Sequence, residues 1–133
     1  MAKSNTITTL YSDFNVNFNV NPITGDLLKV TGTNSVVQSL MNLVQVNYYE
    51  KPFHPEIGSN IRAMLFEQMD SLTSNALAKE IEVLVGNFEP RVSLNNVIVQ
   101  ADYDKNGYYI ELDFNVLSLN NSFTISTFLQ RLR

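Results

Sequence analysis

The sequence predicts a single α+β domain spanning residues 1–133. We expect an N-terminal β-hairpin (13–31), then a helical part (35–86) with three helices, and last a C-terminal antiparallel β-meander (92–130). Apolar residues alternate with period two at both ends of the chain and recur at helical spacing in the middle, which predicts this order. The length supports it, since 133 residues with 44% hydrophobic content suit one core. The chain shows no internal repeat and no linker.

The N-terminal hairpin is predicted from the alternation in residues 14–20, where phenylalanine and valine alternate with asparagine. This pattern is typical of a half-buried strand. Turn-forming residues follow at 21–26, and Leu27, Leu28 and Val30 indicate a returning strand. Because asparagine is a poor strand former, we expect this hairpin to need a partner surface for stability.

The first helix is predicted over residues 35–48, with Thr33 or Asn34 as its N-cap. Its apolar residues recur at the spacing of one helix face: Val37, Leu40, Met41, Val44 and Tyr48. The helix should end before the segment Lys51-Pro52-Phe53-His54-Pro55, because proline cannot continue a helix interior.

A short second helix is predicted over 60–68, after Gly58, with Ser59 or Asn60 as its cap. Its buried side should consist of Ile61, Met64 and Leu65.

Ser71 or Thr73 is expected to open the third helix. The apolar stripe of this helix is Leu77, Ile81, Leu84 and Val85. We expect Gly86 to close it, because glycine tolerates the positive φ of a helix C-cap.

The C-terminal meander is predicted from a return to period two. One strand presents Val97, Val99, Ala101 and Tyr103 on one face, and the next presents Tyr108, Ile110, Leu112, Phe114 and Val116. Asn106-Gly107 is a strong hairpin signal between them, and Asn120-Asn121 is a second possible turn. The change of face at Leu117 and Leu119 indicates a bulge or a switch of burial near Val116. A final strand is favoured over 122–130, with a short helix as the alternative.

Composition excludes several functions. The net charge is −4, with nine basic and thirteen acidic residues and no run of lysine or arginine, so nucleic-acid binding is not expected. The chain has no cysteine, which rules out disulfides and zinc–thiolate sites. The N-terminus lacks a signal peptide and no apolar run could span a membrane, so we expect a soluble protein with no membrane partner.

The sequence predicts no catalytic, cofactor or metal site. The eight acidic residues considered as a carboxylate pair are best explained as solvated charges: Glu50, Glu56, Glu67, Asp70, Glu80, Glu82, Glu89 and Glu111. His54 is the only histidine and is interpreted as a loop or interface residue, since no nucleophile elbow or metal-ligand spacing accompanies it. The glycines are scattered singly, so no phosphate-binding loop is present.

The segment Phe88-Glu89-Pro90-Arg91 should form a stiff, extended elbow between the third helix and the meander. Pro90 fixes its own φ and disfavours helical backbone at Glu89. Glu89 and Arg91 then project to the same side of the extended backbone. Three interpretations remain open: the two charges pair with each other, each meets an opposite charge on a partner, or both are solvated.

Four motifs in order give the chain a family resemblance. They are Val36-Val37-Gln38-Ser39-Leu40-Met41-Asn42-Leu43, Lys51-Pro52-Phe53-His54-Pro55-Glu56-Ile57-Gly58, Leu65-Phe66-Glu67 and Phe88-Glu89-Pro90-Arg91. With the strands at 92–117, they resemble the baseplate wedge family of contractile phage tails, often labelled tail-lysozyme-like, which has relatives in the type VI secretion baseplate. The resemblance covers about residues 10–118. Lys51 stands where the family more often has arginine, which puts a bidentate contact there in doubt.

The resemblance implies a structural subunit of a baseplate wedge, located in the virion tail baseplate and assembled in the host cytoplasm. Its implied partners are larger wedge proteins in a heteromeric bundle, the tail sheath protein, and tube or hub proteins. Residues 108–130 are expected to offer a strand edge to a neighbour, and the expected partner-binding residues are Glu89, Pro90, Arg91, Lys51 and Phe53. Alternatives are a cell-wall-degrading tail lysozyme, a type VI secretion baseplate subunit and a stand-alone adaptor.

Overall fold

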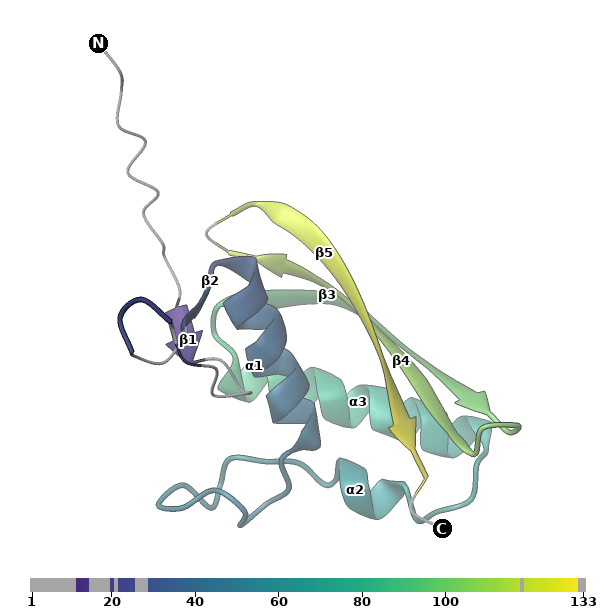
Figure 1. Cartoon of the computed structure of the whole chain (residues 1–133). Helices are drawn as coiled ribbons and strands as arrows, with labels where there is room; N and C mark the ends of the chain where they lie inside the picture. Colours follow the sequence, from purple (N-terminus) through teal and green to yellow (C-terminus); the bar gives the residue numbers. More distant parts are fainter. Residues whose placement is uncertain (1–11, 15–19, 21, 26–28, 118, 132–133) are drawn as a thin grey trace.

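The computed structural model describes residues 12–14, 20, 22–25, 29–117 and 119–131. Its helices and strands are β1 (Ser12–Phe14), β2 (Lys29–Thr31), α1 (Thr33–Gln45), α2 (Ile61–Met64), α3 (Ser71–Phe88), β3 (Val92–Asp102), β4 (Gly107–Val116) and β5 (Asn121–Gln130). The α+β class, the three helices and the antiparallel meander are therefore confirmed (Figure 1).

The main sheet has the order β3-β4-β5, so β4 is its central strand. All ten residues of β4 pair with both neighbours in antiparallel register. Asn106 and Asn120, in the two connecting loops, have positive φ values of 53° and 49°, which asparagine tolerates better than most residues. Both turns that the sequence predicts are confirmed, and β5 confirms the final strand over the alternative of a helix.

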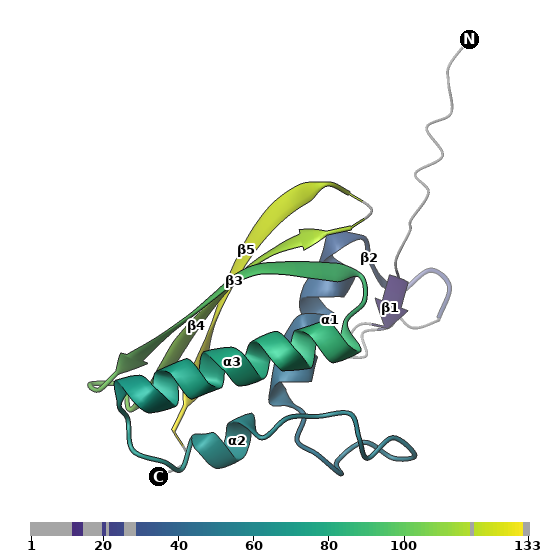
Figure 2. The same ribbon diagram turned by 180° about the vertical axis from the view of Figure 1, so that it is seen from behind.

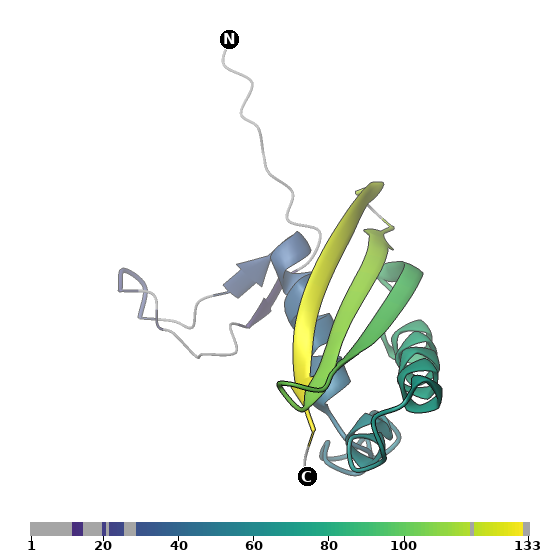
Figure 3. The same ribbon diagram turned by 90° about the vertical axis from the view of Figure 1, so that its right-hand side faces the viewer.

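The hydrophobic core lies between the main sheet and the helices. The predicted inner face of β4 is fully buried: Tyr108, Ile110, Leu112, Phe114 and Val116. It packs with the predicted stripe of α3, which is Leu77, Ile81, Leu84 and Val85, and with Val36, Leu40, Leu43 and Val44 of α1. Figures 2 and 3 show α3 beside β3 and the helices gathered on one side of the sheet. The sheet therefore buries one face and leaves the other to solvent.

Helix α1 differs from its prediction at both ends. It covers Thr33–Gln45 instead of 35–48, and Gly32 occupies the N-cap position without a side-chain cap hydrogen bond, so neither Thr33 nor Asn34 caps it. The chain leaves the helix at Val46, which is extended and accepts a hydrogen bond from the Ser59 amide at 3.2 Å. This tertiary contact ends the helix early and leaves Tyr48 outside it.

Helix α2 is shorter than predicted, covering Ile61–Met64 instead of 60–68. Asn60 makes no side-chain cap, whereas the Ser59 hydroxyl accepts a hydrogen bond from the Ile61 amide at 3.4 Å. Ile61 and Leu65 are buried as predicted, and Met64 packs against the core.

Helix α3 begins one residue after Asp70, whose carboxylate accepts a hydrogen bond from the Thr73 amide at 2.7 Å. The helix opens at Ser71, as predicted, and Asp70 before it is the N-cap, which the sequence analysis did not single out. The helix also continues past Gly86 to Phe88. Pro90 explains this end, because a proline disfavours helical backbone at the residue before it, and Glu89 has non-helical angles, with a φ of −124° and a ψ of 83°.

Two details of the meander differ from the prediction. The register shift lies in β3, between Leu94 and Asn96, and not near Val116. Tyr103 lies in the loop after β3 and is exposed, so it does not share the inner face of Val97. Leu117 is exposed because β4 ends at Val116, which explains the change of face without a bulge.

The N-terminal hairpin is described only in part. β1 and β2 pair in antiparallel register, from Ser12↔Thr31 to Phe14↔Lys29, and residues 22–24 form a turn. The rest of the prediction over 13–31 lies outside the described residues. Among the described residues, no helix combines the length and the apolar character that crossing a bilayer requires.

Candidate assembly interface

The elbow after α3 brings Glu89 and Arg91 together, but it is a turn and not the extended segment predicted: Pro90 and Arg91 lie in the turn, and the Val92 amide donates to the Glu89 carbonyl at 3.4 Å. The Glu89 carboxylate accepts two hydrogen bonds from the Arg91 guanidinium, from Nε at 2.7 Å and from Nη2 at 2.9 Å. The Glu89 side chain is only 3% exposed and that of Arg91 is 22% exposed. This is a bidentate pair in a mostly water-excluded position, where it is stronger than a surface ion pair. Of the three interpretations left open by the sequence, the structure shows the internal pair.

Two serines of α1 complete a network around this pair. The Ser39 hydroxyl donates to Glu89 Oε2 at 2.5 Å, and Arg91 Nη1 donates to the Ser35 hydroxyl at 3.4 Å. The network therefore fastens α1 to the elbow that connects α3 with β3. Sequence reasoning missed both serines. Their four-residue spacing, which places them on one face of α1, was the signal in the sequence that could have identified them.

Opposing effects act on the Glu89 carboxyl. Burial raises its pKa, but the hydrogen bonds from Arg91 and Ser39, together with the Arg91 charge, outweigh burial and bring the pKa below its usual value. Glu89 is therefore an ionised structural partner at neutral pH. A glycosidase general acid needs the opposite, a carboxyl whose pKa is raised.

The proline loop carries the other predicted partner-binding residues, Lys51 and Phe53, and both are exposed. Phe53 is 97% exposed and has a φ of 66°, and Tyr49 in the same loop is 85% exposed with a φ of 67°. Positive φ is uncommon for bulky residues and costs conformational energy, so surrounding contacts must hold this backbone. The loop thus presents two aromatic rings to solvent in a fixed local conformation.

Several contacts hold the proline loop. The Tyr49 amide donates to the Pro55 carbonyl at 3.1 Å, and the Asn47 side chain donates to the Glu50 carboxylate at 2.7 Å. At Gly58 a Cβ atom would lie 2.5 Å from the Asn47 backbone, so only glycine allows this close approach. His54 Nδ1 lies 3.2 Å from a Glu56 carboxylate oxygen in an exposed pair, as expected of a loop residue.

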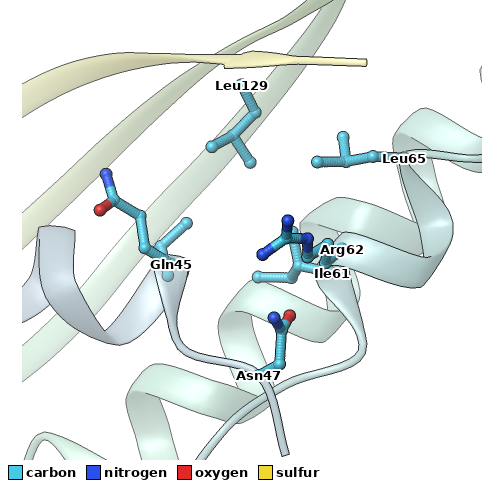
Figure 4. Close-up of a pocket in the computed structure, with 7 residues that line it drawn as sticks. Gln45, Asn47, Ile61, Arg62, Leu65 and Leu129 are labelled. Carbon is cyan, nitrogen blue, oxygen red and sulfur yellow. The ribbon is translucent and has the colours of Figure 1, made fainter. Parts of the chain in front are cut away.

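The edge of β5 and a cleft at its end form the remaining feature. β5 is a terminal strand of the sheet, and its inward side chains Phe123, Ile125 and Leu129 are only partly buried. At the strand's end, an open cleft of about 280 Å³ is lined by Val44, Gln45, Asn47, Ile61, Arg62, Leu65 and Leu129 (Figure 4). β4 is central and fully paired, so the predicted edge within 108–130 is confined to β5.

No group of three or more potential metal-ligating side chains occurs in the part of the chain that the structure describes. The described residues form an elbow held by the Glu89 network, a loop with exposed aromatic rings and a strand edge. These features are typical of a protein that assembles with others.

Comparison with known proteins identifies the family. Residues 30–121 match the family described as baseplate wedge protein gp25. A relative from Enterobacteria phage T4, also described as baseplate wedge protein gp25, is 32% identical over 111 residues, which cover 84% of this chain and 83% of the relative. The chain therefore belongs to the gp25 family of baseplate wedge proteins, and the resemblance seen in the sequence is confirmed.

Solved structures share the fold at lower identity. A tail-lysozyme candidate from Geobacter sulfurreducens has a TM-score of 0.69 at 18% identity, covering 74% of this chain and 89% of its own. A chain of the anti-feeding prophage baseplate has a TM-score of 0.64 at 20% identity, covering 92% and 86%. A chain of the type VI secretion baseplate has a TM-score of 0.57 at 14% identity, covering 72% and 92%.

Proposed function

We propose that this chain acts as one domain and as a structural, non-enzymatic subunit of a contractile-tail baseplate wedge. It joins larger wedge proteins in a heteromeric bundle around the tail tube, and it templates the start of the sheath by pairing a strand with the sheath protein. Its place is the tail baseplate of a particle that assembles in the host cytoplasm. Tube or hub proteins are further candidate partners.

The contact with wedge proteins is assigned to the elbow and the proline loop. Pro90 is exposed and Arg91 is partly exposed, so the elbow surface is accessible while buried Glu89 holds the Arg91 guanidinium in place. Lys51 and Phe53 extend this role to the loop, where the constrained backbone at Phe53 lowers the backbone entropy that is lost when the exposed ring binds. Exposed aromatic and arginine side chains are the usual anchors of protein interfaces.

The contact with the sheath protein is assigned to β5, and this edge is the single observation that carries the templating role. A terminal strand leaves backbone amides and carbonyls unpaired, and a strand from a neighbour satisfies them. β5 has ten residues, which is enough for a long added strand.

The tail-lysozyme alternative has a weaker physical basis. Glu89 is the buried acidic residue among those described, and its lowered pKa and pairing with Arg91 suit a structural role. The fold shared with the Geobacter sulfurreducens protein does not decide activity, since one fold hosts many functions. Release of soluble fragments from peptidoglycan by the purified chain would establish the alternative.

Neighbouring proline substitutions test the strand-pairing role. Successive amides of a strand point to opposite sides within the sheet. One of the two substitutions, Ser126→Pro or Thr127→Pro, therefore removes an amide that faces β4, and the other removes an amide on the outer edge. Thermal melting of the isolated chain distinguishes them, because loss of a β4 hydrogen bond lowers the melting temperature more. The outer-edge variant should stay folded and fail to co-purify with the sheath protein of the same particle. Normal co-purification of that folded variant would refute strand pairing.

A further inference from the structure

The cleft at the end of β5 has the size and lining of a site for a side chain. Its floor is apolar and its rim is polar, with Val44, Ile61, Leu65 and Leu129 below and Gln45, Asn47 and Arg62 around them. Its volume of about 280 Å³ lies just below the usual range of small-molecule pockets, about 300–1,000 Å³. One or two side chains of a partner segment fit this description better than a cofactor.

Arg62 gives the cleft a charge preference. Figure 4 shows its guanidinium among the side chains of Leu129, Leu65 and Asn47. Within the described ranges, the Arg62 side chain has no hydrogen bond and no ion pair. The pKa of Glu50 is lowered mainly by hydrogen bonds from Asn47, and Arg62 adds only a smaller electrostatic effect. The guanidinium is therefore available for a carboxylate from another chain.

The position of Leu129 connects the cleft with the strand edge. Leu129 is the last residue but one of β5, and it pairs with Tyr108 on the side opposite the free edge. An extended segment added to β5 would point every second side chain toward the inner face of the sheet. Leu129 itself lines the cleft together with residues of α1 and α2, so a side chain of the added segment at the level of Leu129 would lie next to the cleft.

We propose that this cleft anchors the partner segment that pairs along β5, with an apolar side chain inserted beside Leu129 and an adjacent aspartate or glutamate bound by Arg62. The inference builds on the strand addition proposed above and specifies the chemistry of the added strand. It commits to an acidic-apolar segment, because a guanidinium without a hydrogen-bonded carboxylate at an apolar cleft disfavours a basic segment, and the strand pairing proposed above makes that segment part of the sheath protein.

A photo-crosslinking experiment locates the occupant. The chain carries p-benzoyl-phenylalanine in place of Gln45 and is co-expressed with the sheath and wedge proteins of the same particle. A matched chain carries the same group in place of Lys79, which is exposed on α3 and away from the cleft. Position 45 should crosslink to a sheath segment in which an apolar residue neighbours an aspartate or glutamate, and position 79 should not crosslink to that segment.

Charge reversal then tests Arg62. Arg62→Glu should weaken sheath binding about five- to tenfold, and lysine in place of the partner's acidic residue should restore it. Lys79→Glu is the matched control and should leave binding unchanged. If the outer-edge proline variant loses sheath binding while Arg62→Glu binds normally and position 45 gives no crosslink, the cleft proposal is overturned and strand pairing stands. If the outer-edge proline also binds normally, both proposals fail.

Discussion

Glu89 is the residue whose environment differs most from what its type suggests. Glutamate is seldom fully buried, yet this side chain is 3% exposed and its carboxylate receives hydrogen bonds from Arg91 and Ser39. The ion pair joins residues two apart, whereas Ser39 lies fifty positions away in the chain. The network therefore stabilises the tertiary structure, because it holds α1 in place against the elbow.

Replacing Glu89 tests this network. Glu89→Gln removes the negative charge and leaves the partly buried Arg91 guanidinium without its counter-charge, so it should lower the free energy of unfolding at pH 7 by about 1–3 kcal/mol. Urea denaturation at pH 7 measures this loss.

The pH dependence of that loss has a defined sign. The pKa of Glu89 is lowered in the folded state, so its contribution to stability is complete above the usual carboxyl pKa of 4.5 and is lost as the pH falls through the folded value. The difference between the original chain and Glu89→Gln should therefore shrink from pH 7 to pH 3. Glu50, Glu56 and Asp70, whose pKa values are also lowered, are common to both chains and cancel. A difference that stays constant over this range would contradict the ion-pair interpretation.

Helix α3 is the element that positions the elbow, and Asp70 defines where it begins. The Asp70 carboxylate lies at the N-terminus, where it accepts the Thr73 amide and interacts favourably with the helix dipole. The same hydrogen bond is the main reason that the pKa of Asp70 is lowered. The sequence placed the start of the helix correctly at Ser71 but did not single out Asp70 as its cap, whose extended backbone has a φ of −134° and a ψ of 176°.

Removing this cap should destabilise the protein without changing its fold. Asp70→Ala leaves an amide of the first helical turn without its side-chain partner and should cost about 1 kcal/mol. Thermal unfolding followed by circular dichroism at 222 nm measures the effect. Asp104→Ala in the β3–β4 loop is the matched control, because it removes an exposed carboxylate outside any helix. Equal melting temperatures for both variants would show that the Asp70 cap does not stabilise the helix measurably.

For the molecule as a whole, most of the proposed partner contacts lie apart from the internal ones, and the elbow alone belongs to both the internal network and the proposed wedge contact. The core and the Glu89 network hold α1, α3 and the sheet together. The proline loop, the outer edge of β5 and the cleft beside it face outward. Variants in the second group can therefore report on assembly without unfolding the chain.

Phe53 allows the sharpest test of this separation. Phe53→Ala removes a ring that is 97% exposed, so the melting temperature should change little, whereas co-purification with the larger wedge proteins should fall at least about tenfold if the ring is an interface hot spot. Tyr103→Ala, which removes another exposed ring in the β3–β4 loop, is the matched control and should co-purify normally. Retention of full binding by Phe53→Ala would remove this residue from the proposed interface.

Patterns in the amino-acid sequence were sufficient to predict the order of the elements, the buried faces of α3 and β4, the two asparagine turns and the family. These features depend on local periodicity, on backbone preferences of single residues and on short motifs. All three are properties of residues that are close together in the sequence. Only the tertiary structure shows where α1 ends, because the Ser59 amide donates a hydrogen bond to the Val46 carbonyl. It also shows that the strand edge predicted within 108–130 lies at β5, because β4 is paired on both sides. It also decided that Glu89 and Arg91 pair with each other, since Ser35 and Ser39 reach them only after α1 has packed against the elbow.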